Sequence, residues 1–196
     1  MKPLRVYLRA LEAEDYRTSH VWRQDPRIWS MVVGRRYFVS SDYEKRWVQD
    51  AIADSHDNVR LAICLRENDE YIGNIYLRNI DWFSRSASLA KLIGSKAHWG
   101  EGYGTEATLL ILRHAFYDLG LERIDARTLV TNLGSIRVNE KCGFRIEGTL
   151  RHAAFKDGAY RDLYLMAVLR EDFDEIATTY GLLPDQPSAP DPSDRG

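Results

Sequence analysis

Three glycines at alternate positions, in the segment Trp99-Gly100-Glu101-Gly102-Tyr103-Gly104, most strongly constrain how this chain can fold. The segment follows an apolar stretch that ends at Ile93 and precedes a long stretch with helical spacing. Glycine permits a tight turn and lets the backbone come close to a ligand. The first turn of a helix has N–H groups without intrahelical partners and carries the positive end of the helix dipole. The segment therefore predicts a strand, a turn and a helix whose start binds a phosphate or pyrophosphate.

Other structures share part of this glycine pattern. An ordinary turn between a strand and a helix has the same local sequence. A Rossmann nucleotide site has Gly-x-Gly-x-x-Gly after a parallel strand, whereas here Thr105 stands at the last glycine position and the preceding strands look antiparallel. A Walker site has Gly-Lys-Ser/Thr after the loop, and no such sequence follows.

The composition is that of a soluble globular protein. Of the 196 residues 44% are hydrophobic and 29% are charged, and the net charge of −2 provides no electrostatic footprint for nucleic acid. No apolar run reaches the roughly 18 residues that a membrane span needs, so no membrane partner is expected. Cys64 and Cys142 have no metal-type spacing and do not form a disulfide framework, which predicts no metal site and a cytoplasmic location.

Hydrophobic periodicity predicts the order of the elements. Alternation indicates strands at 6–11, 59–65, 71–80, 87–94, 123–130, 144–153 and 162–169. Helical spacing indicates helices at 12–24, 42–55, 102–119, 135–142 and 171–180, whereas residues 28–39 are expected to be irregular. This order predicts a mixed α/β fold with helices on the faces of one sheet. We expect one domain over residues 1–180 and a disordered tail rich in proline, aspartate and serine over residues 181–196.

A second motif changes the interpretation of the glycine turn. It is Asn132-Leu133-Gly134-Ser135-Ile136-Arg137-Val138-Asn139-Glu140-Lys141-Cys142-Gly143-Phe144, followed by Glu147-Gly148. Together the two motifs resemble the acetyl-CoA signature of the GNAT N-acetyltransferases, in the branch that is similar to the RimJ/RimL ribosomal-protein acetyltransferases. The shorter segments Gly73-Asn74-Ile75, Asn79-Ile80-Asp81, Asp157-Gly158 and Asp162-Leu163-Tyr164-Leu165-Met166 resemble the same branch. The resemblance extends from Leu4 to Asp172.

The resemblance implies a seven-stranded, mostly antiparallel sheet whose strands splay apart midway. The pantetheine arm of acetyl-CoA would lie in the gap and pair with the backbone at Leu92 and Ile93. The pyrophosphate would bind the amides of Trp99, Gly100, Glu101, Gly102, Tyr103, Gly104 and Thr105. Asn132 matches the family position that bonds the pantetheine arm, with Ser135 beside it, although the residue pattern equally indicates caps of a short helix.

Two positions depart from the family pattern that the resemblance supplies. Many relatives have a tyrosine as the acid where this chain has Asn139, and an asparagine can only stabilise the departing thiolate by a hydrogen bond. Relatives often place a glutamate where this chain has Ser88. Asp81, His20, Glu14 or a water relay remain as candidates for the base. The candidate catalytic residues are therefore Asn139, Asp81 and Ser88.

The resemblance implies an enzyme that transfers the acetyl group of acetyl-CoA to a primary amine without a metal. The acceptor is either a protein N-terminus or a small-molecule amine such as an amino sugar. Charges between Glu14 and Asp57 nearly cancel, whereas a polyamine enzyme is expected to be more acidic there, and Arg35-Arg36 favours an anionic group on the substrate. A non-catalytic acyl-CoA-binding module is the alternative, because both familiar catalytic residues are missing. Many relatives are dimers, so a homodimer is a candidate assembly.

Overall fold

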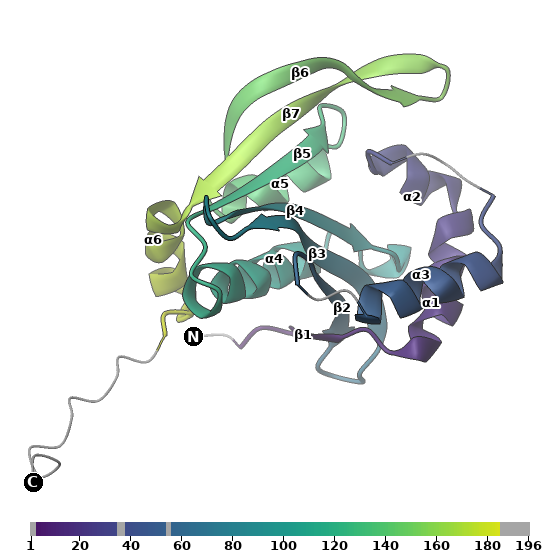
Figure 1. The fold of residues 1–196 in the computed structure, drawn as a ribbon, viewed down its shortest axis with the longest axis horizontal. Coiled ribbons are helices and arrows are strands. Elements are labelled where there is room, and N and C mark those ends of the chain that lie inside the picture. Colours follow the sequence, from purple (N-terminus) through teal and green to yellow (C-terminus); the bar gives the residue numbers. More distant parts are fainter. Residues whose placement is uncertain (1–2, 35–37, 54–55, 185–196) are drawn as a thin grey trace, which may run out of the picture.

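Seven strands form one sheet in the order β1-β2-β3-β4-β5-β7-β6 (Figure 1). The computed structural model describes residues 3–34, 38–53 and 56–184. Arg35, Arg36 and residues 185–196 lie outside this part, so the expectations about them stay predictions. The strands are β1 (Val6–Ala10), β2 (Val59–Leu65), β3 (Tyr71–Asp81), β4 (Ser86–Ile93), β5 (Arg123–Leu129), β6 (Arg145–Lys156) and β7 (Ala159–Leu169).

Helices flank the sheet and confirm the predicted mixed α/β fold. They are η1 (Ala13–Asp15), α1 (Tyr16–Gln24), α2 (Pro26–Met31), α3 (Ser41–Ala53), η2 (Lys96–His98), α4 (Tyr103–Arg113), η3 (His114–Asp118), α5 (Leu133–Lys141) and α6 (Arg170–Tyr180). The larger core joins one face of the sheet to the apolar side of α4, where Leu109, Ile111 and Leu112 are fully buried. A smaller cluster joins the other face to α3 through Ala51.

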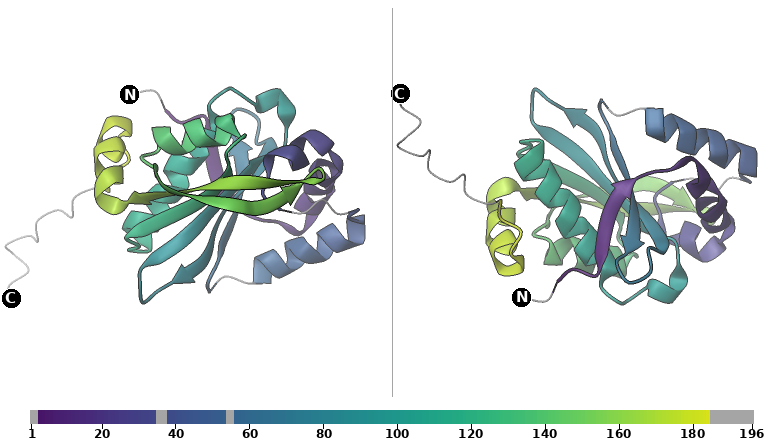
Figure 2. Two further views of the ribbon diagram at one scale, coloured as in Figure 1. Left: turned by 90° about the horizontal axis from the view of Figure 1, so that it is seen from above. Right: turned by 90° about the horizontal axis from the view of Figure 1, so that it is seen from below.

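The sheet opens between β4 and β5, its one parallel pair among the described strands. Their register contains three pairs, Ser86 with Arg123, Ala87 with Ile124 and Ser88 with Asp125. Beyond Ser88, β4 continues in register with β3 as far as Ile93, while β5 stays paired with β7. The β6–β7 hairpin follows β5 away from the first four strands, as Figures 1 and 2 show from three directions.

Residues 28–39 are more regular than the sequence indicates. Pro26 begins the short helix α2 immediately after Asp25, whose side chain accepts a hydrogen bond from the Arg27 amide at 2.8 Å. A proline at the first helical position and an aspartate cap before it are both typical of a helix start. The expectation of irregular structure was therefore wrong for the first part of this segment. In the described part of the chain, no helix is both long and apolar enough for a membrane span.

Candidate active site

The end of β4 and the beginning of α4 form one side of the opening in the sheet. Gly94 donates its N–H to Ile72 of β3 at 2.8 Å. Backbone groups of an antiparallel strand alternate in direction along the chain. By this alternation Leu92 directs its backbone groups toward β3, and Ile93 directs its own toward the opening. Of the two residues expected to pair with a pantetheine arm, the geometry favours Ile93.

The Ile93 carbonyl already has a partner. The indole Nε1 of Trp99 donates to it at 2.7 Å, and the Trp99 side chain is 38% exposed. A second donor at this carbonyl would have to use its remaining lone pair beside the indole, or displace the indole. The Trp99 N–H donates to the Lys96 carbonyl at 3.2 Å, so the pyrophosphate contact expected from this amide stays a prediction.

The glycine turn has the backbone conformation that its sequence predicts. Gly100 and Gly102 have φ angles of +84° and +90°, which L-residues rarely adopt. Gly102 precedes the first turn of α4, and its carbonyl accepts the N–H groups of Thr105 and Glu106 at 3.0 and 3.1 Å. A Cβ on Gly100 would meet no atom within 4 Å, so the turn is open to a ligand there. Glu101 is exposed, as a solvent-facing carboxylate should be.

Arg5 adds a positive charge to this turn, which sequence reasoning missed. Its guanidinium donates to the Glu101 carbonyl at 2.6 Å and to the Glu106 carboxylate at 2.7 Å, and it lies 4.4 Å from the centre of the Tyr103 ring. Glu106 would otherwise place a negative charge beside the start of α4. The Arg5–Glu106 pair neutralises that charge and leaves a turn suited to an anion.

Asn132 and Ser135 lie at the start of α5, where the structure shows a cap. The Asn132 Oδ1 accepts the Ser135 N–H at 3.0 Å, and its Nδ2 donates to the Met31 carbonyl of α2 at 2.8 Å. Of the two roles open to these residues, capping is the one visible here. The same contacts tie α5 to the α1–α2 segment on the far side of the opening.

Ser88 has a carboxylate partner at the last paired position before the sheet opens. Its hydroxyl donates to the Asp125 carboxylate, with 3.1 Å to each oxygen. Asp125 comes from β5 and is only partly buried. A carboxylate from the neighbouring strand therefore lies beside residue 88, the position where relatives often place a glutamate. Only the pairing of β4 with β5 brings these residues together, so no local signal in the sequence indicated Asp125.

Asp81 is placed poorly for the catalytic role considered for it. Its carboxylate accepts the N–H groups of Phe83 and Ser84 at 2.9 and 2.8 Å and closes the β3–β4 turn. These hydrogen bonds, with the Ser84 amide first, lower the pKa of the exposed Asp81 carboxyl. A lowered pKa makes a carboxylate a weaker base. Asp81 therefore has a structural role in the turn, and its assignment as a base stays a prediction that these contacts do not favour.

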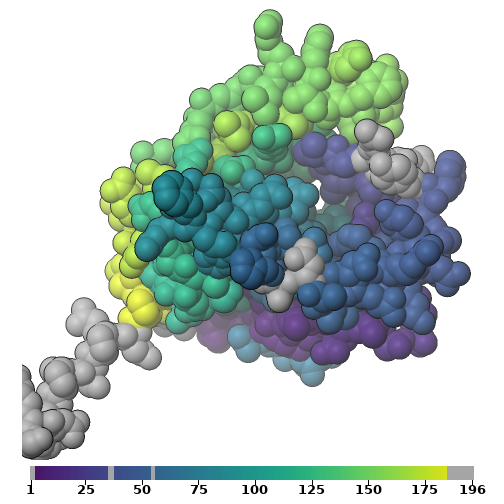
Figure 3. All heavy atoms as spheres, in the orientation of Figure 1, coloured from purple at the N-terminus to yellow at the C-terminus, as the bar shows by residue number. Residues whose placement is uncertain are grey.

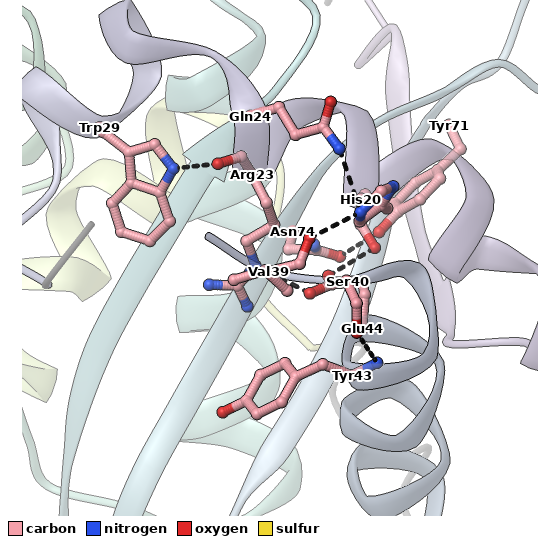
Figure 4. A network of polar contacts seen from close by, with 11 residues as sticks. His20, Arg23, Gln24, Trp29, Val39, Ser40, Tyr43, Glu44, Tyr71 and Asn74 are labelled. Carbon is pink, nitrogen blue, oxygen red and sulfur yellow. Dashed lines mark hydrogen bonds and ion pairs between the residues drawn. The ribbon is translucent and has the colours of Figure 1, made fainter. Parts of the chain in front are cut away.

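Two other base candidates are held within helices. Glu14 pairs with Arg17 on the exposed side of the η1–α1 segment at 2.9 Å. His20 contacts the Val39 carbonyl at 2.9 Å, as Figure 4 shows. These contacts support local structural roles for both side chains.

Asn139 is fully buried and all its amide atoms have partners. Its Oδ1 lies 2.5 Å from the ammonium of Lys91, and its Nδ2 lies 3.2 Å from Thr128 Oγ1 and 3.5 Å from Met166 Sδ. The Asn139 amide cannot donate to a thiolate without giving up one of these contacts. The hydrogen bond from Asn139 to a thiolate stays a prediction, and in this structure the Asn139 amide is held by Lys91, Thr128 and Met166.

Helices α1, α2 and α3, together with the short η1 segment before α1, form the remaining side of the candidate site, here called the acceptor wall. Glu44 is completely buried and accepts from the Ser19 hydroxyl at 2.7 Å and the Arg23 Nε at 3.0 Å, and Figure 4 shows this network beside the Tyr71–Asn74 pair. The surface is hollowed between these helices and the β6–β7 hairpin (Figure 3). Lys156 of the hairpin reaches across to the carbonyls of residues 29, 32 and 34.

The glycine turn, the opened strands and the capped α5 match the site that acetyl-CoA would need. Comparison with known families agrees, because the model of the acetyltransferase (GNAT) domain matches residues 5–145. This chain belongs to the GNAT acetyltransferase family. Probable N-acetyltransferase YjcK of Bacillus subtilis (strain 168) is 31% identical over 180 residues, which cover 88% of this chain and 98% of that one.

Two polyamine enzymes are also similar to this GNAT protein. Spermidine N(1)-acetyltransferase of Escherichia coli (strain K12) is 27% identical over 170 residues, covering 86% of this chain and 88% of the relative. The crystal structure of spermidine N-acetyltransferase from Vibrio cholerae in complex with CoA and spermine superposes with a TM-score of 0.79. Their sequences are 28% identical, and the match covers 86% of this chain and 98% of the other.

These findings establish the class of reaction. The protein is a GNAT-type N-acetyltransferase, and acetyl-CoA is its co-substrate. Its described residues contain no cluster of three or more metal-ligating side chains. Backbone amides at the start of α4, with Arg5 beside them, would hold the pyrophosphate, and Ile93 would face the pantetheine arm.

Proposed function

We propose that this GNAT protein acetylates the primary amine of a small molecule by direct attack of the amine on the thioester of acetyl-CoA. The opening of the sheet directly beyond Ser88 and Asp125 supports this proposal. The Asp125 carboxylate lies where the two halves of the sheet separate. The glycine turn lies at the other end of the β4 edge that is not paired with β5.

Asp125 is the group proposed to take the amine proton. A carboxylate that is partly exposed can exchange protons with water, and Ser88 fixes its orientation from β4. Positioned proton acceptors typically contribute on the order of 100-fold or more to such reactions. Holding the amine against the thioester contributes separately by proximity.

The acceptor wall favours a small amine over a long polycation. Three of its carboxylates already have cationic partners, because Arg9 pairs with Asp15, Lys96 with Asp25 and Arg23 with Glu44. A polyamine would compete with these internal cations for the same carboxylates. Amino sugars and other amines with a single charge would not need to compete for these carboxylates.

Thiol release from acetyl-CoA, measured with a panel of amines, tests the proposed function. The panel contains amino sugars, simple primary amines, spermidine, spermine and peptides with free N-termini. We expect the highest kcat/KM with a small monoamine. Preference for peptides would support the RimJ/RimL-like assignment and contradict a small-molecule acceptor. CoA binding without turnover of any amine would instead identify a non-catalytic module.

Several broader expectations belong to the same proposal. The RimJ/RimL-like branch rests on the shorter motifs near Gly73, Asn79 and Asp157. Both cysteines are buried free thiols, which supports a cytoplasmic setting. The proposal also includes one catalytic domain over residues 1–180 and a homodimeric assembly. Size-exclusion chromatography with light scattering tests the oligomeric state.

A further inference from the structure

Lys91 occupies an unusual place for a cation. It lies on β4 three positions beyond Ser88, the last residue that pairs with β5, and it is only partly exposed. Its ammonium contacts Asn139 of α5, and Asn139 in turn contacts Thr128 of β5. The three side chains therefore connect β4 to β5 by way of α5, at the level where the strands have separated. A ligand threaded between the strands must pass this network.

The chemistry of the network fixes how Asn139 is oriented. An ammonium can only donate hydrogen bonds, so the atom that faces Lys91 must be the amide oxygen of Asn139. The amide nitrogen then faces Thr128 and Met166, as the structure has it. Among the described residues, Asn139 is the hydrogen-bond partner of the Lys91 ammonium, which leaves two of its three N–H groups for a ligand.

We propose that Lys91 donates the proton that the CoA sulfur takes up when the acetyl group leaves, with Asn139 as its positioning residue. This inference rests on the proposed function, because it concerns the same transfer. The amine nitrogen forms a bond to the acetyl carbon, the C–S bond breaks, and its electron pair takes a proton from the Lys91 ammonium. The nitrogen loses its own proton to Asp125 or water, and the neutral Lys91 regains one from solvent.

The acidity of Lys91 suits this step. Burial lowers the pKa of the Lys91 ammonium from 10.5 to about 8. A free thiol has a pKa of about 8.5, and proton transfer is efficient between groups of matched pKa. A lysine with the ordinary pKa of 10.5 would hold its proton about 300 times more tightly.

The described side chains around Lys91 do not titrate near pH 8, so Lys91 is the group that changes charge there. Cys142, directly after α5, is the described titratable side chain whose charge acts on Lys91, and burial raises the pKa of this thiol to about 12. Cys142 is therefore neutral at the pH values where Lys91 titrates. Asn139, Thr128 and Met166 do not ionise in this range. Within this network, Lys91 is therefore the group that changes its protonation state in this pH range.

The first experiment measures the pKa of the CoA thiol in the complex, from the ultraviolet absorbance of its thiolate. An ammonium within a few ångströms lowers the pKa of an acid by about one unit or more. We expect a lowered thiol pKa in complexes of the wild type and of Lys91→Arg, and a rise of about one unit in Lys91→Gln. The amide introduced by Lys91→Gln can still donate to Asn139, so the network remains connected. Lys141→Gln is the matched control, because Lys141 is an exposed lysine on α5, the helix that carries Asn139.

The second experiment separates proton transfer from a fixed charge. Arginine keeps the charge but does not release its proton near neutral pH. We expect kcat to fall by about 100-fold in both Lys91→Arg and Lys91→Gln. In the wild type, kcat should decline above about pH 8, because Lys91 loses its proton there. Lys141→Gln should retain the wild-type profile.

Two results would overturn the proposal. The first is a thiol pKa that is the same in the wild-type and Lys91→Gln complexes, since Lys91 would then not touch the sulfur. The second is a wild-type rate in Lys91→Arg, since a fixed charge would then suffice. If the thiol pKa shifts as expected but no amine is acetylated, the proposed function fails and the contact between Lys91 and the thiol stands.

Discussion

At the residue scale, the carboxylate of Asp125 stands beside the Ser88 hydroxyl at the point where β4 and β5 part. A glutamate on β4 would reach this region from one strand, whereas here a serine orients an aspartate from the next. The two residues are far apart in the sequence, and only the parallel pairing of their strands gives the carboxylate a partner. This arrangement leads to a direct test of the proposed base.

Asp125→Asn should lower kcat by about 100-fold near neutral pH while CoA affinity remains unchanged. The amide cannot accept the amine proton, and the loss should shrink at high pH, where the free amine is already deprotonated. Steady-state kinetics and CoA titrations measure both quantities. Glu147→Gln is the control. It removes an exposed carboxylate of β6 that pairs with Arg123, a residue of the same strand as Asp125. Equal wild-type and Asp125→Asn rates would refute the assignment.

At the element scale, the start of α4 and the turn before it act as one unit. The left-handed Gly102 ends the turn and begins the helix, and a Cβ added at this position would lie only 3.3 Å from the Arg5 guanidinium. Arg5 comes from the segment before β1, so the glycine turn gains a contact from a distant part of the sequence. A change at Gly102 should therefore affect the ligand more than the fold.

Gly102→Val should weaken CoA binding at least about tenfold, because the side chain intrudes between the turn and Arg5. Its positive φ also makes the backbone unfavourable, at a cost of about 1–3 kcal/mol in unfolding free energy. Gly158→Val is the matched control, since Gly158 has φ of +76° in the β6–β7 turn with open space around it. Both variants should lose similar stability in urea unfolding. Unchanged CoA affinity in Gly102→Val would remove the turn from the site.

The contact between α2 and the β6–β7 hairpin is the other element-scale feature. Lys156 is 9% exposed and donates to the carbonyls of Trp29, Val32 and Gly34, the last two at 2.7 and 3.1 Å. Carbonyls at the end of a helix attract a cation, because they have no intrahelical donors and carry the negative end of the dipole. The hairpin and α2 therefore hold each other in place over the acceptor side.

Lys156→Met should reduce the unfolding free energy by about 1–3 kcal/mol, because three carbonyls lose their charged donor. It should also speed hydrogen exchange in residues 27–34 and raise KM for the amine more than it lowers kcat. Lys141→Met serves as the exposed control. Exchange rates in residues 27–34 that match those of the wild type would contradict the role of Lys156 as a clamp.

At the scale of the whole molecule, the half-buried Lys91 links stability to pH. Its pKa is lowered from 10.5 to about 8 by burial, so between these values the unfolded chain binds more protons than the folded one. Stability from this group must therefore rise as pH increases through that window. Below about pH 8 both states are protonated, and the unfavourable contribution of the buried charge is constant.

The unfolding free energy of the wild type, relative to Lys91→Gln, should increase between about pH 8 and 10.5, by up to about 1.4 kcal/mol per pH unit. Urea unfolding at several pH values measures this difference. The comparison with the variant cancels the opposite effect of half-buried tyrosines such as Tyr76, whose pKa is raised by desolvation. A pH-independent difference between the two proteins would show that Lys91 keeps its ordinary pKa.

Local patterns predicted most of the elements because they depend on neighbouring residues. Alternation located Val59–Leu65 as β2, and helical spacing with flanking glycines located α4 and α5 within a few residues. The segment around α2 was missed, since its helix is short and its aromatic side chains obscure the periodicity. The β6–β7 strands extend beyond their predicted ends, because pairing with each other supplies hydrogen bonds that neither sequence pattern shows.

The sequence by itself determined the family, the glycine turn and the order of strands and helices, because these are written in contiguous motifs and local periodicity. Only the tertiary structure decided which side chains meet where β4 and β5 separate. Asp125 beside Ser88, and Lys91 beside Asn139, each join residues from different elements. Their chemistry depends on burial and on distances across the sheet, which strand pairing and helix packing set and no local segment encodes.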